Sequence, residues 1–144
     1  MEVIHGKHKE NYLDILKSLV NIDLISRDNH VNIFNEGFTM VSEYDFGEVG
    51  EKEFYEKYIN KKGDGKFVII PLEDSYPAFL FDNNRDSFQD YSEIINYPKL
   101  ENMGKHIEHA LTIICEVFFI LDIENKWCIY SNRYFDTTQV AVKS

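Results

Sequence analysis

Short apolar segments bounded by turn-forming residues constrain the fold of this chain most strongly. Residues 66–71 and 77–81 are two such segments, and residues 127–130 and 139–143 follow a similar pattern near the C-terminus. Segments of this length suit strands and are shorter than an average helix. We expect all four to be strands, and the first, which is apolar throughout, to be buried on both faces of a sheet.

Other segments carry apolar residues at three- and four-residue spacing, which is typical of amphipathic helices. This spacing predicts helices over about residues 8–24, 54–61, 88–97 and 103–121. The third is expected to finish before Pro98, because the residue before a proline avoids helical geometry. Alternating apolar and polar residues predict a hairpin over residues 31–44, turning at Asn35-Glu36-Gly37.

The order of these segments decides the fold class. Strands and helices do not alternate regularly, as they would in a parallel α/β sheet. We therefore predict one α+β domain over residues 1–144, with a mostly antiparallel sheet of about six strands and helices packed mainly on one face. The strands at 127–130 and 139–143 would close the sheet as a pair around residues 131–138.

Charge and composition exclude several classes of function. The chain has 15 basic and 25 acidic residues, a net charge of −10, which repels phosphate backbones and anionic lipid surfaces. Charged residues interrupt the first 30 positions, and the most apolar stretch, residues 110–121, contains Glu116 and falls short of the roughly 20 residues that cross a bilayer. We expect a cytoplasmic protein, with Cys115 and Cys128 reduced, that binds neither nucleic acid nor membrane.

Catalytic and metal-binding patterns are weak. His106-Ile107-Glu108 has the His-x-Glu of zinc deaminases, but the Pro-Cys-x-x-Cys segment that completes the zinc shell is missing. His106 and His109 lie three residues apart on the predicted helix and could share a metal, although a hydrogen-bonded histidine at the edge of the core is the simpler interpretation. The sequence around Asp82 and Asp86 lacks the central glycine of a calcium loop. We predict no catalytic site, no metal and no cofactor.

Acidic residues concentrate in two segments that also carry aromatic side chains. Residues 36–56 contain seven acids against Lys52, a net charge of −6, and residues 73–93 contain six acids against Arg85, a net charge of −5. The rest of the chain is therefore close to neutral. Such segments can be a solvated surface or a docking surface, because charge accelerates the encounter with a basic partner and aromatic anchors supply short-range energy. The predicted partner-binding residues are Glu43, Tyr44, Asp45, Phe46, Glu48, Glu51, Asp82, Asp86 and Asp90.

The C-terminal quarter resembles a known group of proteins. Its predicted long apolar helix runs into the strand Trp127-Cys-Ile-Tyr130, followed by Ser-Asn-Arg133 and another apolar strand. Residues 118–142 as a whole resemble bacterial immunity proteins that neutralise polymorphic or contact-dependent toxins. The resemblance implies a class of function, a single-domain inhibitor that protects the cell producing the toxin. It assigns no binding residues.

We therefore expect a non-enzymatic immunity protein, a monomer or weak homodimer, that covers a basic toxin domain, plausibly a nuclease, with its acidic surface. Two alternatives stay open. One is a small metal-dependent enzyme that uses His106, His109 and Glu108, and the other is a regulatory domain that self-associates through exposed aromatic residues. The first hypothesis depends on whether the two acidic segments adjoin in the fold.

Overall fold

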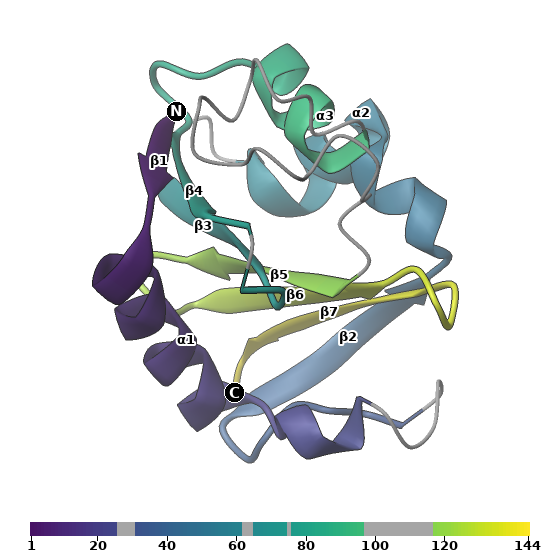
Figure 1. Ribbon diagram of the computed structural model, residues 1–144. Helices are drawn as coiled ribbons and strands as arrows, with labels where there is room; N and C mark the ends of the chain where they lie inside the picture. The colour runs from purple at the N-terminus through teal and green to yellow at the C-terminus, as the bar shows by residue number, and fades with distance from the viewer. Residues whose placement is uncertain (26–30, 62–64, 75, 97–116) are drawn as a thin grey trace.

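The computed structural model describes residues 1–25, 31–61, 65–74, 76–96 and 117–144. Its strands and helices follow one another without regular alternation, and they are mapped onto the ribbon in Figure 1. In chain order they are β1 (Glu2–Ile4), α1 (Gly6–Leu19), η1 (Ile22–Leu24), β2 (Phe38–Tyr44), η2 (Phe46–Gly50), α2 (Lys52–Phe54), η3 (Tyr55–Ile59), β3 (Lys66–Pro71), β4 (Ala78–Asp82), α3 (Phe88–Asn96), β5 (Val117–Asp122), β6 (Trp127–Asn132) and β7 (Thr137–Lys143).

The strands form one seven-stranded sheet in the order β1-β4-β3-β5-β6-β7-β2, and every neighbouring pair is antiparallel. The three-residue strand β1 forms one edge and the seven-residue strand β2 forms the other. An isolated bridge between Val20 and Phe34 holds the loop before β2 against the end of α1. The sheet therefore brings residues 38–44 against the C-terminal strand, because β2 pairs with β7 (Figure 1).

Apolar side chains on both faces of the sheet explain why its central strands are buried. One face, with Phe67, Ile120 and Ile129, packs against η2, α2, η3 and α3. The opposite face, with Phe119 and Cys128, packs against α1 and the segment that follows it. Burial of both faces removes the polar/apolar alternation expected of a half-exposed strand. No helix among the described residues is long and apolar enough to cross a bilayer.

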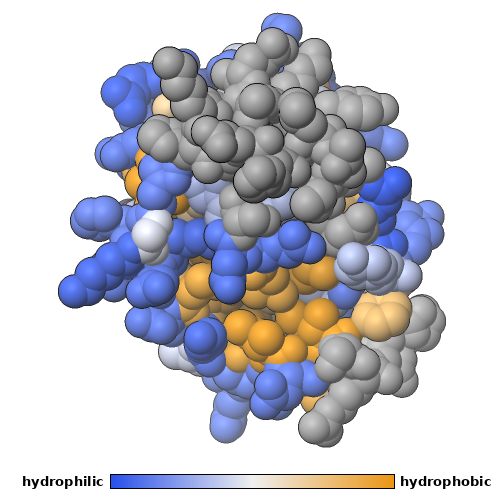
Figure 2. All heavy atoms as spheres, in the orientation of Figure 1, coloured by the Kyte–Doolittle hydropathy of each residue, from blue (hydrophilic) through white to orange (hydrophobic). Residues whose placement is uncertain are grey.

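Apolar surface also reaches solvent next to α1. Several members of the cluster on this face are only partly buried, including Leu19, Ile22 and Leu72. In the space-filling view of Figure 2 a hydrophobic area lies at the centre of the face and hydrophilic side chains surround it.

Much of the predicted organisation is confirmed. The fold is α+β with an antiparallel sheet, and most helical segments cover one face of that sheet. Strands β3 and β4 lie where the short apolar segments predicted them, and β6 pairs with β7 as the closing pair. Helix α1 begins at Gly6 and ends at Leu19, so the predicted helix over residues 8–24 is displaced toward the N-terminus.

Two predicted elements are wrong, and β1 was not predicted at all. Residues 31–44 do not form a hairpin, because β2 pairs with β7, in a register that sets Phe38 opposite Lys143. Residues 117–121 of the predicted helix over 103–121 are part of strand β5, and residues 103–116 of it lie outside the described residues. A continuous apolar run matches a buried strand and a buried helix equally well, so spacing alone could not separate them.

Candidate functional site

The strand ends that carry Glu43 and Asp82 lie at opposite corners of the sheet. The two acidic segments touch elsewhere, because Tyr55 Oη donates to Asn83 Oδ1 at 3.2 Å and Tyr91 Oη donates to the Val49 carbonyl. Tyr44, at the end of β2, pairs with Thr138, whereas Asp82, at the end of β4, pairs with Lys66. Strands β3, β5, β6 and β7 separate β4 from β2, and five strand spacings of about 4.8 Å amount to roughly 24 Å. The strand ends that carry Glu43 and Asp82 therefore cannot contribute to one small contact area.

Around the end of β2, acidic side chains from three parts of the chain lie close together. We call Glu43, Asp45, Glu48 and Asp136 the acidic rim. The Phe46 backbone N–H donates to Asp136 Oδ1 at 3.0 Å, which fixes the β6–β7 turn against the start of η2. The Asp45 backbone N–H donates to Glu48 Oε2 at 3.0 Å. Backbone contacts thus hold the carboxylates of the rim in place.

Glu43 ties the rim to the sheet. Its Oε2 accepts hydrogen bonds from Thr137 Oγ1 at 3.2 Å and from Gln139 Nε2 at 3.4 Å. Both donors belong to β7 and are buried, whereas Glu43 itself is exposed. A carboxylate that accepts two side-chain hydrogen bonds has one preferred orientation, so Glu43 is a preorganised acceptor rather than a freely rotating charge.

The two aromatic residues that sequence analysis assigned to this site point inward. Phe46 packs edge-on against Phe118 with ring centroids 6.0 Å apart, and Tyr44 packs against Phe54 at 5.6 Å. Both are half-buried at the margin of the core. Their main effect is to anchor the rim on the sheet, and Tyr44 offers a partner only part of its ring.

Beside the rim, the hydroxyl groups of Ser42, Tyr44 and Tyr58 form a network that also includes the ammonium group of Lys57. Tyr58 Oη donates to Ser42 Oγ at 2.9 Å and also contacts Tyr44 Oη, and Lys57 Nζ lies 3.5 Å from Tyr44 Oη. The hydrogen bonds of Lys57 to Tyr58 and Tyr44 raise its pKa, so that it remains charged at neutral pH. Burial tends to raise the pKa of Tyr58, but hydrogen bonds to Ser42, Tyr44 and Lys57 outweigh it and lower the pKa below its ordinary value.

Two residues of this site were not predicted from the sequence. Tyr134 is 70% exposed in the β6–β7 turn, the most exposed large hydrophobic residue among those described, and Asp136 lies two positions beyond it. Asp136 has a φ of 48°, a conformation that Asp and Asn tolerate better than most residues. An acid in a tight turn next to an aromatic residue is a signal that could have identified both.

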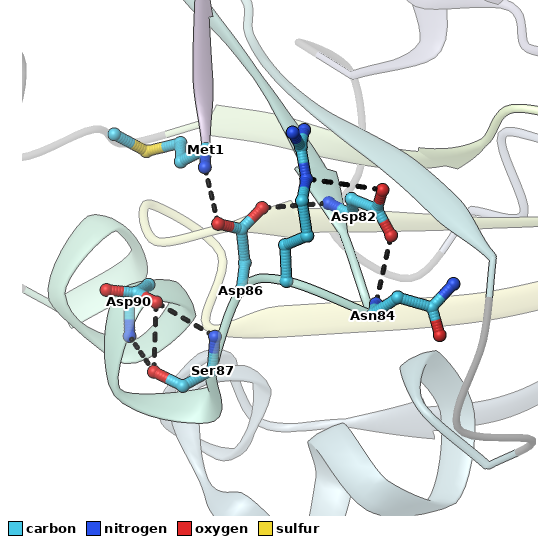
Figure 3. Close-up of polar contacts among 7 residues, drawn as sticks. Met1, Asp82, Asn84, Asp86, Ser87 and Asp90 are labelled. Atoms are coloured by element: carbon cyan, nitrogen blue, oxygen red, sulfur yellow. Dashed lines mark hydrogen bonds and ion pairs between the residues drawn. The ribbon is translucent and has the colours of Figure 1, made fainter.

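Of the remaining predicted residues, Glu51 is exposed at the start of α2, next to the rim segment. The other three have local structural roles (Figure 3). Asp90 Oδ2 accepts the Ser87 backbone N–H at 2.8 Å and thereby caps α3. Asp82 accepts the Asn84 N–H at 2.9 Å and pairs with Arg85 at 3.5 Å. Asp82 and Asp90 therefore stabilise a turn and a helix start within residues 82–90.

Asp86 occupies the centre of Figure 3, between the chain terminus and β4. Its Oδ1 accepts the Met1 amino group and its Oδ2 accepts the Asp82 backbone N–H at 2.9 Å. Burial acts to raise the pKa of Asp86, but the Asp82 N–H and the N-terminal amino group outweigh it, so the pKa is lower than that of an ordinary aspartate. This carboxylate joins β1, β4 and α3.

We expect Asp86→Asn to lower the free energy of unfolding by about 1–2 kcal/mol at pH 7, because two charge-assisted hydrogen bonds become weaker. With a native pKa below the unfolded one, the ionised carboxylate adds stability above about pH 4, and this contribution is lost as the pH falls through the native pKa. Urea unfolding at several pH values measures the difference. The exposed Asp14→Asn is the control, and an equal loss at pH 7 and pH 3 would contradict the assignment.

The described part of the chain contains no site for metal binding or thiol chemistry. His106, Glu108, His109 and Cys115 lie outside the described residues. Within residues 1–25, 31–61, 65–74, 76–96 and 117–144, no group of three His, Cys, Asp or Glu side chains is placed to hold a metal ion. Cys128 is a buried free thiol, and burial raises its pKa far above the ordinary value.

The segment that resembles immunity proteins lies in the core. Trp127 packs against Phe67 with ring centroids 6.3 Å apart, and Cys128, Ile129 and Tyr130 are each at most 2% exposed. Its apolar character reflects the central position of β6 in the sheet. A comparison with known proteins finds no matching family model, no similar curated protein and no similar solved structure.

Proposed function

We propose that this protein is a non-enzymatic immunity protein, which inhibits a basic toxin domain by covering it with the acidic rim. One observation carries the proposal: Glu43, Glu48 and Asp136 are held by hydrogen bonds at one end of the sheet, and the turn that carries Asp136 also carries Tyr134, which is 70% exposed. Exposed tyrosine next to concentrated charge is the composition of a binding hot spot rather than of an ordinary solvated surface.

The charge of the rim favours a cationic partner. Glu43, Asp45, Glu48 and Asp136 carry four negative charges, and Arg133 is the cation within the same turn. None of the four takes part in an ion pair with another described residue. Because no cation among the described residues neutralises these carboxylates, their negative electrostatic potential attracts a basic partner and speeds association at low salt.

A nuclease is the toxin class that suits this surface best. Nucleases bind phosphates with Lys and Arg side chains, and carboxylates can occupy the same side chains in place of phosphates. Inhibition would be by occlusion, with Tyr134 as the short-range anchor. Asp82, Asp86 and Asp90 are left out of this contact because they lie toward the far corner of the sheet or serve local structure.

The decisive experiment uses amide variants at the rim. Glu43→Gln, Asp45→Asn and Glu48→Gln together remove three charges and retain an oxygen acceptor at each position. We expect association with the toxin domain encoded beside this chain to slow by about 10–100-fold at low salt, and the difference to shrink at high salt. Stopped-flow association and survival of toxin-expressing cells are the two measurements.

A matched control removes three charges elsewhere. Glu10→Gln, Asp14→Asn and Asp23→Asn are exposed positions on α1 and η1. This control should associate at close to the wild-type rate. If association slows equally for both triple variants, the net charge and not the rim governs binding. If association slows for neither variant, or if no toxin gene lies beside this one, the proposal is wrong.

A further inference from the structure

A hollow of about 730 Å³ lies around the start of β3 and the β5–β6 turn, and its lining includes Tyr58, whose hydroxyl belongs to the network beside the acidic rim. It is formed where η3 ends, β3 begins and the β5–β6 turn closes, so three connections of the chain meet around it. The lining residues are Tyr58, Ile59, Lys61, Gly65, Lys66, Asn84, Asp122, Ile123, Glu124, Lys126, Trp127 and Val142, and we call this hollow the basic groove.

Lysines gather at the basic groove although the protein as a whole is acidic. Lys61, Lys66 and Lys126 line it. These are three of the nine lysines in the described parts of the chain. Against the two carboxylates of the lining they leave a local charge of +1, in a chain whose net charge is −10.

The two carboxylates of the basic groove do not neutralise it. Asp122 is 8% exposed, and its Oδ2 accepts the Lys126 backbone N–H at 3.0 Å, so it serves the turn. Glu124 forms an ion pair with Lys126 at 2.7 Å, but both side chains are about two-thirds exposed. An exposed pair of this kind contributes little and can exchange for a competing anion. Lys61 and Lys66 form no ion pair with another described residue.

We propose that the basic groove binds a small molecule carrying two or more phosphate groups. Its volume lies in the range of small-molecule sites. Ammonium groups from the loop after η3, from β3 and from the β5–β6 turn can contact several phosphate oxygens at once, and Asn84 adds an amide donor. Trp127 and Tyr58 give one wall an aromatic surface, which suits a ligand that also carries a ring.

Binding at this site can be followed by tryptophan fluorescence, because Trp127 is the only tryptophan of the chain. Titration of the full chain with pyrophosphate, at constant ionic strength in chloride, should change the tryptophan fluorescence along a saturable curve. Equilibrium dialysis gives the stoichiometry, which we expect to be one pyrophosphate per chain. A linear change without saturation, or the same change with added chloride alone, would contradict the proposal.

Two double lysine variants test whether pyrophosphate binds at the basic groove. Lys61→Gln with Lys66→Gln removes two lining lysines that form no ion pair with a described residue, and should weaken pyrophosphate binding about tenfold or more. Lys7→Gln with Lys17→Gln makes the same change of charge on the exposed surface of α1 and should leave binding within twofold of wild type. Because all four side chains are exposed, far-UV circular dichroism should confirm that both variants fold. Equal effects of the two pairs would overturn the assignment.

A comparison of ligands defines the chemistry. If a nucleoside triphosphate binds more tightly than pyrophosphate and the nucleoside alone does not bind, the phosphates carry recognition and the aromatic wall adds to it. If the nucleoside binds as well as the triphosphate, phosphate recognition is excluded. The basic groove and the acidic rim share no residue, so either proposal can fail while the other stands.

Discussion

In a Cys115→Ser variant, Cys128 should react with a thiol reagent only when the protein unfolds. Cys128 is fully buried among Leu121, Tyr130 and Val68 on the α1 side of the sheet, and burial raises the pKa of its thiol. The reagent therefore cannot reach the sulfur in the folded protein, and the fraction of reactive thiolate is small. For a domain of ordinary stability, we expect labelling to be about 10⁴-fold slower than for an unfolded thiol. The rate should rise with urea in parallel with the fraction unfolded.

An exposed cysteine provides the matched control for this labelling. Ile123 is 39% exposed in the β5–β6 turn, and Ile123→Cys in a background lacking Cys115 and Cys128 should react at nearly the rate of an unfolded thiol. Fast labelling of Cys128 without loss of secondary structure would show that β6 opens locally and that the α1 face is not closed. Mass spectrometry of the intact chain distinguishes the two results.

Phe119→Ala should lower the free energy of unfolding by about 4 kcal/mol, the largest loss we expect from a single substitution in this protein. Phe119 is at the centre of β5, is 0% exposed and lies 5.2 Å from the ring of Tyr130. Truncation leaves a cavity between β3 and β6 that neighbouring strands cannot fill, because the ladder holds them in register. Guanidinium unfolding measures the change.

Tyr134→Ala is the control for Phe119→Ala, because it truncates an aromatic side chain that is 70% exposed. We expect it to change stability by no more than about 0.5 kcal/mol. Phe119→Leu should cost much less than Phe119→Ala, since it retains most of the buried volume. If Phe119→Ala and Tyr134→Ala destabilise equally, β5 is not the centre of the core.

Charge is distributed unevenly over this protein. The rim gathers carboxylates at the end of the sheet that carries Tyr44 and the β6–β7 turn, whereas the end that carries Lys66 and the β5–β6 turn has lysines together with Asp82, Asp122 and Glu124. The net charge of −10 does not reveal this difference. It gives the two proposed binding surfaces opposite preferences, a basic protein at the acidic rim and a phosphorylated small molecule at the basic groove.

Part of the candidate site could be predicted from the sequence. The concentration of acids in residues 36–56 drew attention to Glu43, Asp45 and Glu48, which do belong to the rim. Asp136 and Tyr134 could not be added in this way, because they reach the rim through the pairing of β2 with β7, across more than 90 positions of the chain. The three lysines of the basic groove are equally dispersed in the sequence.

By itself the sequence determined the α+β class, the strands β3, β4, β6 and β7 and the acidic character of the molecule, because these depend on local composition and spacing. Only the tertiary structure decided that β2 pairs with β7, that residues 117–121 are part of a strand and that Glu43 and Asp82 lie at opposite corners of the sheet. Strands pair through backbone hydrogen bonds, to which every residue except proline contributes both a donor and an acceptor. Which distant strands pair is therefore decided by how the faces of the sheet pack, and not by the residue types of either strand alone.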